Sequence, residues 1–154
     1  MDHTFWRTAR SGALAQELKP ELASLKYFQG SWACEGRFVA NGRPISAAMT
    51  FAPELDGAWL AHRLYDRPPN PFHALELWGY DKTARQFESF IHDNFGGVRL
   101  FTSPGWTGDR LVWTGDALTP DAKEVQHFIF ERKSQSEVRD ELRGEDGEGR
   151  VEAS

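Results

Sequence analysis

Cysteine is almost absent from this chain, and its scarcity limits both the cross-linking and the metal chemistry open to it. Cys34 is the single cysteine in 154 residues, so no disulfide can form within the chain and a cysteine-rich zinc site is excluded. No segment approaches the roughly 18 apolar residues of a membrane-spanning helix, and residues 1–10 lack the apolar run of a signal peptide. We therefore expect a cytoplasmic protein that does not bind membranes.

Positive charge is also scarce, and the common catalytic motifs are missing. The chain has 18 Lys and Arg against 23 Asp and Glu, a net charge of −5, and no basic stripe that would attract a phosphate backbone. It contains no Gly-x-Gly-x-x-Gly, no phosphate-binding loop, no His-Glu-x-x-His and no Gly-x-Ser-x-Gly. We expect no nucleic-acid partner and no metal site. The missing motifs also make nucleotide-dependent or serine-hydrolase chemistry a poor fit to this sequence.

Aromatic residues and turn signals are what the chain does contain. Aromatics make up 13% of it, with six tryptophans, whose indole N–H groups need partners when buried. Short segments rich in β-branched and aromatic residues alternate with Gly, Pro, Asn and Asp turns. The predicted strands are 32–39, 45–51, 58–65, 72–80, 86–95, 98–102, 110–116, 123–132 and 137–143, with a stub from 150.

One helix precedes these strands. Leu14, Leu18, Leu22 and Leu25 recur at helical spacing over residues 12–27, and Pro20 predicts a break followed by a second turn. The whole chain, 1–154, is expected to be a single domain, and residues 1–11 and 144–154 are candidates for flexible ends.

The connections between the strands are all hairpin-sized, which predicts the fold class. We expect a mainly all-β protein: an antiparallel up-and-down β-barrel of about 8–10 strands with a short N-terminal helix. Closing the barrel removes exposed strand edges. Because the last strand is short, the seam is expected to be weak, and a second copy of the chain could complete it as a homodimer.

Several stretches resemble a bacterial family of calycin-like domains of unknown function. They are Leu25-x-x-Phe28-x-Gly30-x-Trp32, Leu55-Asp56-Gly57-x-Trp59-Leu60, Trp78-Gly79-Tyr80-Asp81 and Phe130-Glu131-Arg132. That family is similar to the lipocalin and fatty-acid-binding barrels and to the heme-binding nitrobindins. The resemblance implies a barrel whose closed end is plugged by Trp32, but it implies no activity.

Histidines within strands are the first candidate functional residues. His62 shares a strand face with Leu60 and Leu64, and His127 shares one with Val125 and Ile129, so both are expected to point inward. His92 also lies in a strand, on a face that does not decide its direction. Each could bind a ligand or act as an acid or base, or could be an ordinary structural histidine.

Carboxylates, arginines and aromatic rings complete the candidate site. Inside a barrel, Glu76, Asp93 or Asp140 would be costly unless paired, and could orient a ligand or move a proton. Arg63 and Arg99 could pair with such a carboxylate or hold a carboxylate of the ligand. The rings that could line an aromatic ligand site, or simply form the core, are Trp32, Trp59, Trp78, Trp106, Trp113, Tyr65 and Tyr80.

Three functions remain open at this point. The first is a binding module that holds a hydrophobic or aromatic small molecule, with His62, His127 or Glu76 as the polar anchor. The second is a cofactor-independent cyclase, isomerase or lyase in which a histidine works with Asp93 or Glu76. The third is a heme barrel with one axial histidine; otherwise no cofactor is expected. A structural or interaction role, with the interior filled by the protein's own side chains, is the remaining possibility.

Overall fold

The structure is a computed structural model that describes residues 2–7, 16–38, 41–118, 123–144 and 151–152. These residues form one antiparallel sheet of twelve strands and a 3₁₀ helix, η1 (Pro20–Phe28). The strands are β1 (Asp2–Arg7), β2 (Gly30–Arg37), β3 (Pro44–Glu54), β4 (Trp59–Asp66), β5 (His73–Asp81), β6 (Gln86–Asp93), β7 (Val98–Ser103), β8 (Trp106–Thr107), β9 (Arg110–Leu118), β10 (Lys123–Ser134), β11 (Glu137–Gly144) and β12 (Val151–Glu152).

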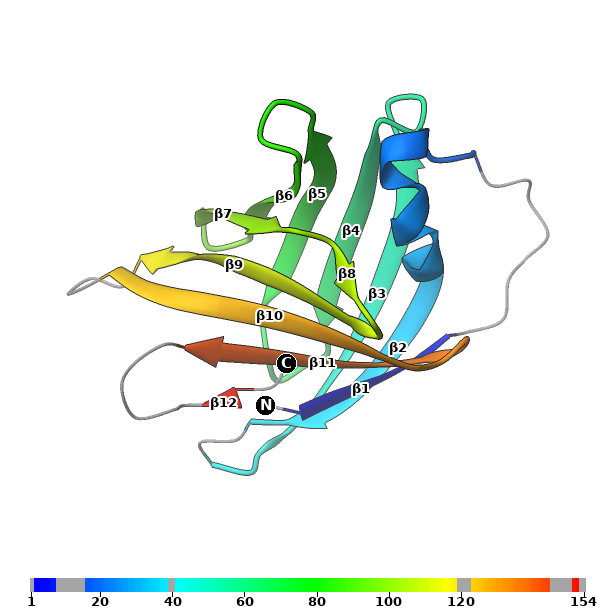
Figure 1. Ribbon diagram of the computed structural model, residues 1–154. Helices are drawn as coiled ribbons and strands as arrows, with labels where there is room; N and C mark the ends of the chain where they lie inside the picture. The colour runs from blue at the N-terminus through cyan, green and yellow to red at the C-terminus, as the bar shows by residue number, and fades with distance from the viewer. Residues whose placement is uncertain (1, 8–15, 39–40, 119–122, 145–150, 153–154) are drawn as a thin grey trace.

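The sheet curls on itself, as the hairpin-sized connections predicted. From β2 to β11, sequential strands are hydrogen-bonded neighbours, with the short β8 attached only to β9. This curled half-barrel is visible in Figure 1. The all-β, up-and-down fold class is confirmed, and nine of the observed strands, together with β12, correspond to the predicted segments.

Part of the N-terminal segment forms a strand, β1, although residues 1–11 were candidates for a flexible end. β1 pairs with β2 on one side and with β11 on the other, so it bridges the two edges of the half-barrel. The chain's own N-terminal segment therefore closes the seam, and no second copy is needed for this purpose.

The helix is shorter and tighter than the leucine pattern predicted. Residues 16–19 are not helical, and Leu14 lies outside the described residues. Pro20 occupies the first turn, where its missing N–H costs nothing. Leu22, Leu25 and Phe28 are buried at a spacing of three, which is the period that aligns side chains on one face of a 3₁₀ helix.

The helix and its neighbours close one end of the barrel. Trp32 is 1% exposed, and its Nε1 donates to the backbone oxygen of Phe28 at 2.7 Å, which places it as the expected plug. The turn before β4 supports the same end: a side chain at Gly57 would meet the backbone oxygen of Glu17 at 2.1 Å, so only glycine allows this approach.

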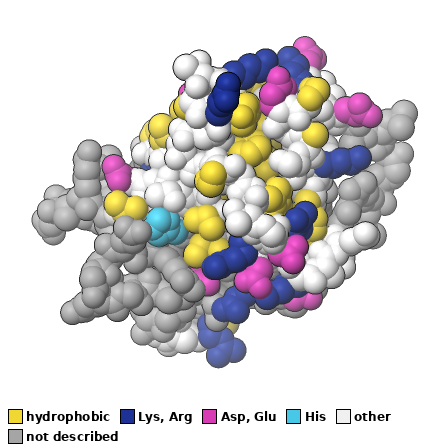
Figure 2. Space-filling view, in the orientation of Figure 1, with side chains coloured by type: hydrophobic (Ala, Val, Ile, Leu, Met, Phe, Trp, Pro, Cys, Tyr) yellow, Lys and Arg dark blue, Asp and Glu magenta, His cyan; other side chains and the backbone are white. Residues whose placement is uncertain are grey.

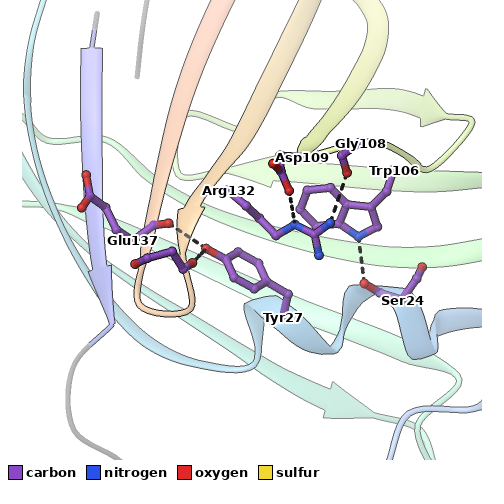
Figure 3. A network of polar contacts seen from close by, with 8 residues as sticks. Ser24, Tyr27, Trp106, Gly108, Asp109, Arg132 and Glu137 are labelled. Carbon is purple, nitrogen blue, oxygen red and sulfur yellow. Dashed lines mark hydrogen bonds and ion pairs between the residues drawn. The ribbon is translucent and has the colours of Figure 1, made fainter.

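A network of polar and ring contacts fastens the helix to the strands (Figure 3). The Tyr27 hydroxyl donates to the backbone oxygens of Glu137 and Ser134, at 2.7 and 2.8 Å. The Arg132 guanidinium lies 4.0 Å from the centre of the Trp106 ring, a cation–π contact, and the Trp106 Nε1 donates to a helix carbonyl. Burial raises the pKa of Tyr27 to about 12, so its hydroxyl keeps the proton that it donates.

The opposite end is the barrel mouth, and it carries a proline loop (67–71) between β4 and β5 and the Gly96-Gly97 turn between β6 and β7. Asn94, after β6, donates to the Pro71 carbonyl at 2.7 Å and accepts from the His73 N–H at 2.9 Å. The proline loop and the Gly96-Gly97 turn therefore lie side by side. On the face shown in Figure 2, acidic and basic side chains are interspersed with hydrophobic ones, so this face has no extended patch of one sign. No helix in the described ranges is long and apolar enough to cross a membrane.

Candidate functional site

A small cavity lies inside the barrel, between the aromatic plug and the mouth. Eight strands contribute to its wall, because alternate residues of each strand point inward. The lining is mostly apolar and aromatic, with four polar side chains among it. The lining residues are Met49, His62, Leu64, Glu76, Ser89, Ile91, Phe101, Trp113, Phe128, Phe130 and Asp140.

The size of the cavity decides which molecules it can hold. It leaves about 30 Å³ for the centre of a water molecule. That is more than the about 10–15 Å³ that one ordered water needs, and less than the about 150 Å³ of an apolar cavity that binds benzene. A single ring is therefore the largest guest that this space could take, and a long acyl chain does not fit.

Glu76 is the acceptor around which the polar side chains are arranged. Its Oε2 accepts from Trp78 Nε1 at 2.9 Å and from Ser89 Oγ at 3.3 Å, and it lies 3.4 Å from Nδ1 of His62. Burial raises its pKa, but the charge and hydrogen bond of His62, the Trp78 bond and the charge of Arg99 outweigh it, so the pKa of Glu76 lies below its usual value. The carboxylate is therefore ionised.

The His62 imidazole is buried and contacts several side chains. It is 3% exposed and stacks on Phe51, with ring centres 4.1 Å apart and an interplanar angle of 9°. Its Nε2 lies 3.2 Å from the sulfur of Met49, while Nδ1 faces Glu76. Both imidazole nitrogens thus already have neighbours, which fixes the ring as a support for the carboxylate.

Trp113 is a lining side chain with an unused polar atom; the other such atom is Nδ1 of His62, which has only its ion-pair contact with Glu76. It is 2% exposed, and its Nε1 is buried with no hydrogen-bond partner among the described residues. Its ring lies 4.8 Å, centre to centre, from that of Trp78, which donates to Glu76. A buried donor without an acceptor costs about 1–3 kcal/mol, so this wall favours a guest that accepts a hydrogen bond.

Five of the sequence-predicted site residues are brought together inside the barrel. His62, Glu76, Trp113 and Asp140 line the cavity, and Trp78, 1% exposed, packs directly behind them. The inward direction predicted for His62 is confirmed. Arg99 shares the inner face of β7 with Phe101 and is close enough for its charge to lower the pKa of Glu76.

Three other predicted ligand-binding residues lie on the outer face of β4. Trp59 covers Gly79, where an added Cβ would come within 2.4 Å of its ring. Arg63 forms an exposed ion pair with Glu54 at 3.9 Å, and Tyr65 is 49% exposed. Because Leu60, His62 and Leu64 face inward, the odd-numbered residues between them must face outward.

The remaining predicted catalytic residues are not in the cavity. The inward direction predicted for His127 is wrong: its neighbours Phe128 and Phe130 line the cavity, whereas its Nδ1 lies 2.9 Å from the Thr114 hydroxyl on the outer face. His92 is exposed. Asp93 accepts from the backbone N–H groups of Phe95 and Gly97, both at 2.9 Å, and so organises the β6–β7 turn.

Sequence reasoning missed several cavity residues. Met49, Phe101 and Phe128 look like ordinary strand hydrophobics, and nothing in the sequence separates them from core residues. Ser89 had a usable signal: it lies between Phe87 and Ile91 on an alternating face, where a small polar residue among large apolar ones indicates a packing or hydrogen-bonding role.

The described interior does not fit a heme. Of the histidine side chains that the structure describes, only His62 lies inside the barrel; its Nδ1 lies 3.4 Å from Oε2 of Glu76 and its Nε2 lies 3.2 Å from the sulfur of Met49, so each nitrogen faces a protein side chain. The cavity is also several times too small for a porphyrin. Within the described ranges, no group of three His, Cys, Asp or Glu side chains is placed to hold a metal ion.

No protein-family model matches this chain, and no curated protein has a recognisably similar sequence. The site must therefore be interpreted from its own geometry.

Proposed function

We propose that this protein is a calycin-like small-molecule-binding barrel that holds a hydrophobic or aromatic molecule of single-ring size. The observation that carries the proposal is the cavity itself: an aromatic-lined space of about 30 Å³ for a water centre, with its polar groups concentrated around one carboxylate. Small-molecule sites are usually apolar concavities with a few placed polar groups.

The cost of the His62–Glu76 pair supports a binding role. A buried ion pair is often no more stabilising than well-packed apolar residues of the same volume, so a protein that needed only a filled core would gain little from it. The pair instead supplies a fixed, ionised carboxylate in an apolar space. Such a group orients a ligand that the aromatic walls hold by contact area.

The same pair is the strongest argument for the enzymatic alternative, but its geometry favours binding. A general base needs a free nitrogen within hydrogen-bond reach of the substrate. Here Nε2 of His62 faces the Met49 sulfur at 3.2 Å, and the other nitrogen faces Glu76. Catalysis by the imidazole would require Met49 to move first.

A cavity-filling variant tests the proposal. Ser89→Leu places three extra carbons on the cavity wall, whereas Thr50→Leu makes a similar change on the exposed face of β3. We expect benzene and toluene to bind the wild type and Thr50→Leu equally, as measured by ligand-observed NMR, and Ser89→Leu to bind at least about tenfold more weakly. Circular dichroism checks that both variants are folded.

Two results would overturn the proposal. One is the absence of binding of either probe to the folded wild type at millimolar concentration. The other is equal binding by the folded Ser89→Leu variant, which would place the probes outside the cavity.

A further inference from the structure

Two polar atoms of the cavity have unused hydrogen-bonding capacity of opposite kinds. The two hydrogen bonds and the ion pair of the Glu76 carboxylate all go to Oε2, which leaves Oε1 able to accept a hydrogen bond, and the side chain keeps 13% of its surface exposed. The Trp113 Nε1, in contrast, is a buried donor without an acceptor. One atom can accept a hydrogen bond, and the other is a donor that lacks an acceptor.

The two atoms belong to neighbouring parts of one wall. Glu76 and Trp113 line the same small cavity, and they are linked through Trp78, which donates to Glu76 at 2.9 Å and lies 4.8 Å from the Trp113 ring. Both side chains border one space that offers a water centre only about 30 Å³, so a single polar group placed there has both side chains as neighbours.

The donor and acceptor inventory selects that group. An ionised carboxylate only accepts hydrogen bonds, and an indole N–H only donates one. An ammonium could satisfy Glu76 but not Trp113, while a ketone or an ether could satisfy Trp113 but not Glu76. A hydroxyl donates one hydrogen bond and accepts others, so it satisfies both atoms at once.

The rest of the lining indicates what carries the hydroxyl. Phe101, Phe128 and Phe130 surround the space, and stacked or edge-to-face contacts with them favour an aromatic ring. A phenolic hydroxyl, with a pKa near 10, stays protonated at neutral pH and can donate a short charge-assisted hydrogen bond to the carboxylate. We propose that the ligand is a single-ring phenol whose hydroxyl donates to Glu76 and accepts from Trp113.

This inference rests on the proposed binding function, and a matched set of probes separates the two. Phenol and toluene have nearly the same shape, and anisole is larger by one methyl group; anisole lacks the donor, and toluene lacks both donor and acceptor. We expect phenol to bind the wild type at least about tenfold more tightly than toluene, with anisole in between, because a hydrogen bond to a charged group contributes about that factor. Isothermal titration calorimetry measures the three affinities.

Two variants assign the preference to its atoms. Trp113→Phe keeps a ring in the wall but removes the N–H, so phenol and anisole should both weaken by about fivefold to tenfold while toluene changes little. Glu76→Gln can keep an acceptor for Trp78 and present an amide N–H to the cavity instead of Oε1. Phenol should then lose its advantage over anisole, and a general loss of packing would not produce this selective change.

The possible outcomes distinguish failure of the phenol inference from failure of the proposed binding function. Equal affinity of the folded wild type for phenol, anisole and toluene would overturn the phenol inference and leave the binding function intact. The inference would also be overturned if the preference for phenol over toluene were undiminished in folded Trp113→Phe, or if the preference for phenol over anisole were undiminished in folded Glu76→Gln. Failure of all three probes to bind the folded wild type would overturn both proposals.

Discussion

Replacing His62 and Glu76, singly and together, separates two free energies: the net contribution of the pair to stability, and the loss of stability when one partner is removed and the other stays buried. His62→Phe keeps a ring that can stack on Phe51, as the imidazole does at 4.1 Å. Glu76→Met keeps a chain of similar length but removes the acceptor of the Trp78 N–H and the Ser89 hydroxyl. The double variant fills the same space with apolar groups.

The expected magnitudes follow from these contacts. Each single change leaves a buried polar group without its partner, at a cost of about 3–5 kcal/mol, so independent effects would sum to about 6–10 kcal/mol. In the double variant the main remaining loss is the hydrogen bond of the Trp78 N–H, at about 1–3 kcal/mol. We therefore expect a coupling free energy of at least about 3 kcal/mol between the two positions.

Urea unfolding followed by far-ultraviolet circular dichroism measures the four proteins, and an unchanged m-value shows that the comparison is valid. Circular dichroism is preferable to fluorescence because the substitutions alter the surroundings of Trp78. If the double variant loses the sum of the single losses, the two side chains do not act as a pair and the reasoning fails.

Three further predictions address pH, the thiol and the helix. Because the pKa of Glu76 is held below its unfolded value of 4.5, its contribution to stability is complete above about pH 4.5 and is lost as pH falls through the lower folded-state value. The free energy of unfolding of Glu76→Gln should therefore depend less on pH in the acid range than that of the wild type, and identical curves would refute this. Cys34 is fully buried, and burial raises its pKa, so a thiol reagent should label it only at the rate of unfolding; prompt labelling of the folded protein would contradict this. Tyr27→Phe removes the hydroxyl bonded to Glu137 and should cost about 1–2 kcal/mol in urea unfolding, whereas an unchanged midpoint would show that the bond contributes nothing.

The strands were predictable because the signals that define them are local. Turn residues such as Asp56-Gly57 and Gly96-Gly97 stop one segment and start the next, and those glycines do adopt positive φ, at 79° for Gly57 and 83° for Gly96. The inward direction of His62 was predictable for a related reason. Its strand alternates clearly, with Leu60 and Leu64 on the same face.

The direction of His127 was not predictable from its strand. Both faces of β10 are apolar, one through Val125 and Ile129 and the other through Phe128 and Phe130. The alternation of residues along β10 therefore allows His127 to point inward or outward. Strand pairing settles its direction: Phe128 lies opposite Trp113 of β9, and both rings lie on the cavity side of the sheet, so His127 lies on the other side.

The sequence by itself determined the strand pattern, the fold class and most of the polar residues at the site, because side-chain alternation and turn chemistry act over a few residues. The tertiary structure decided the rest. β1 has too few apolar residues to be recognised as a strand, and its hydrogen-bond partners on β2 and β11 meet only when the barrel curls. Likewise, Glu76 and Trp113 are 37 positions apart, and only closure of the sheet brings an unused acceptor and an unused donor into one cavity.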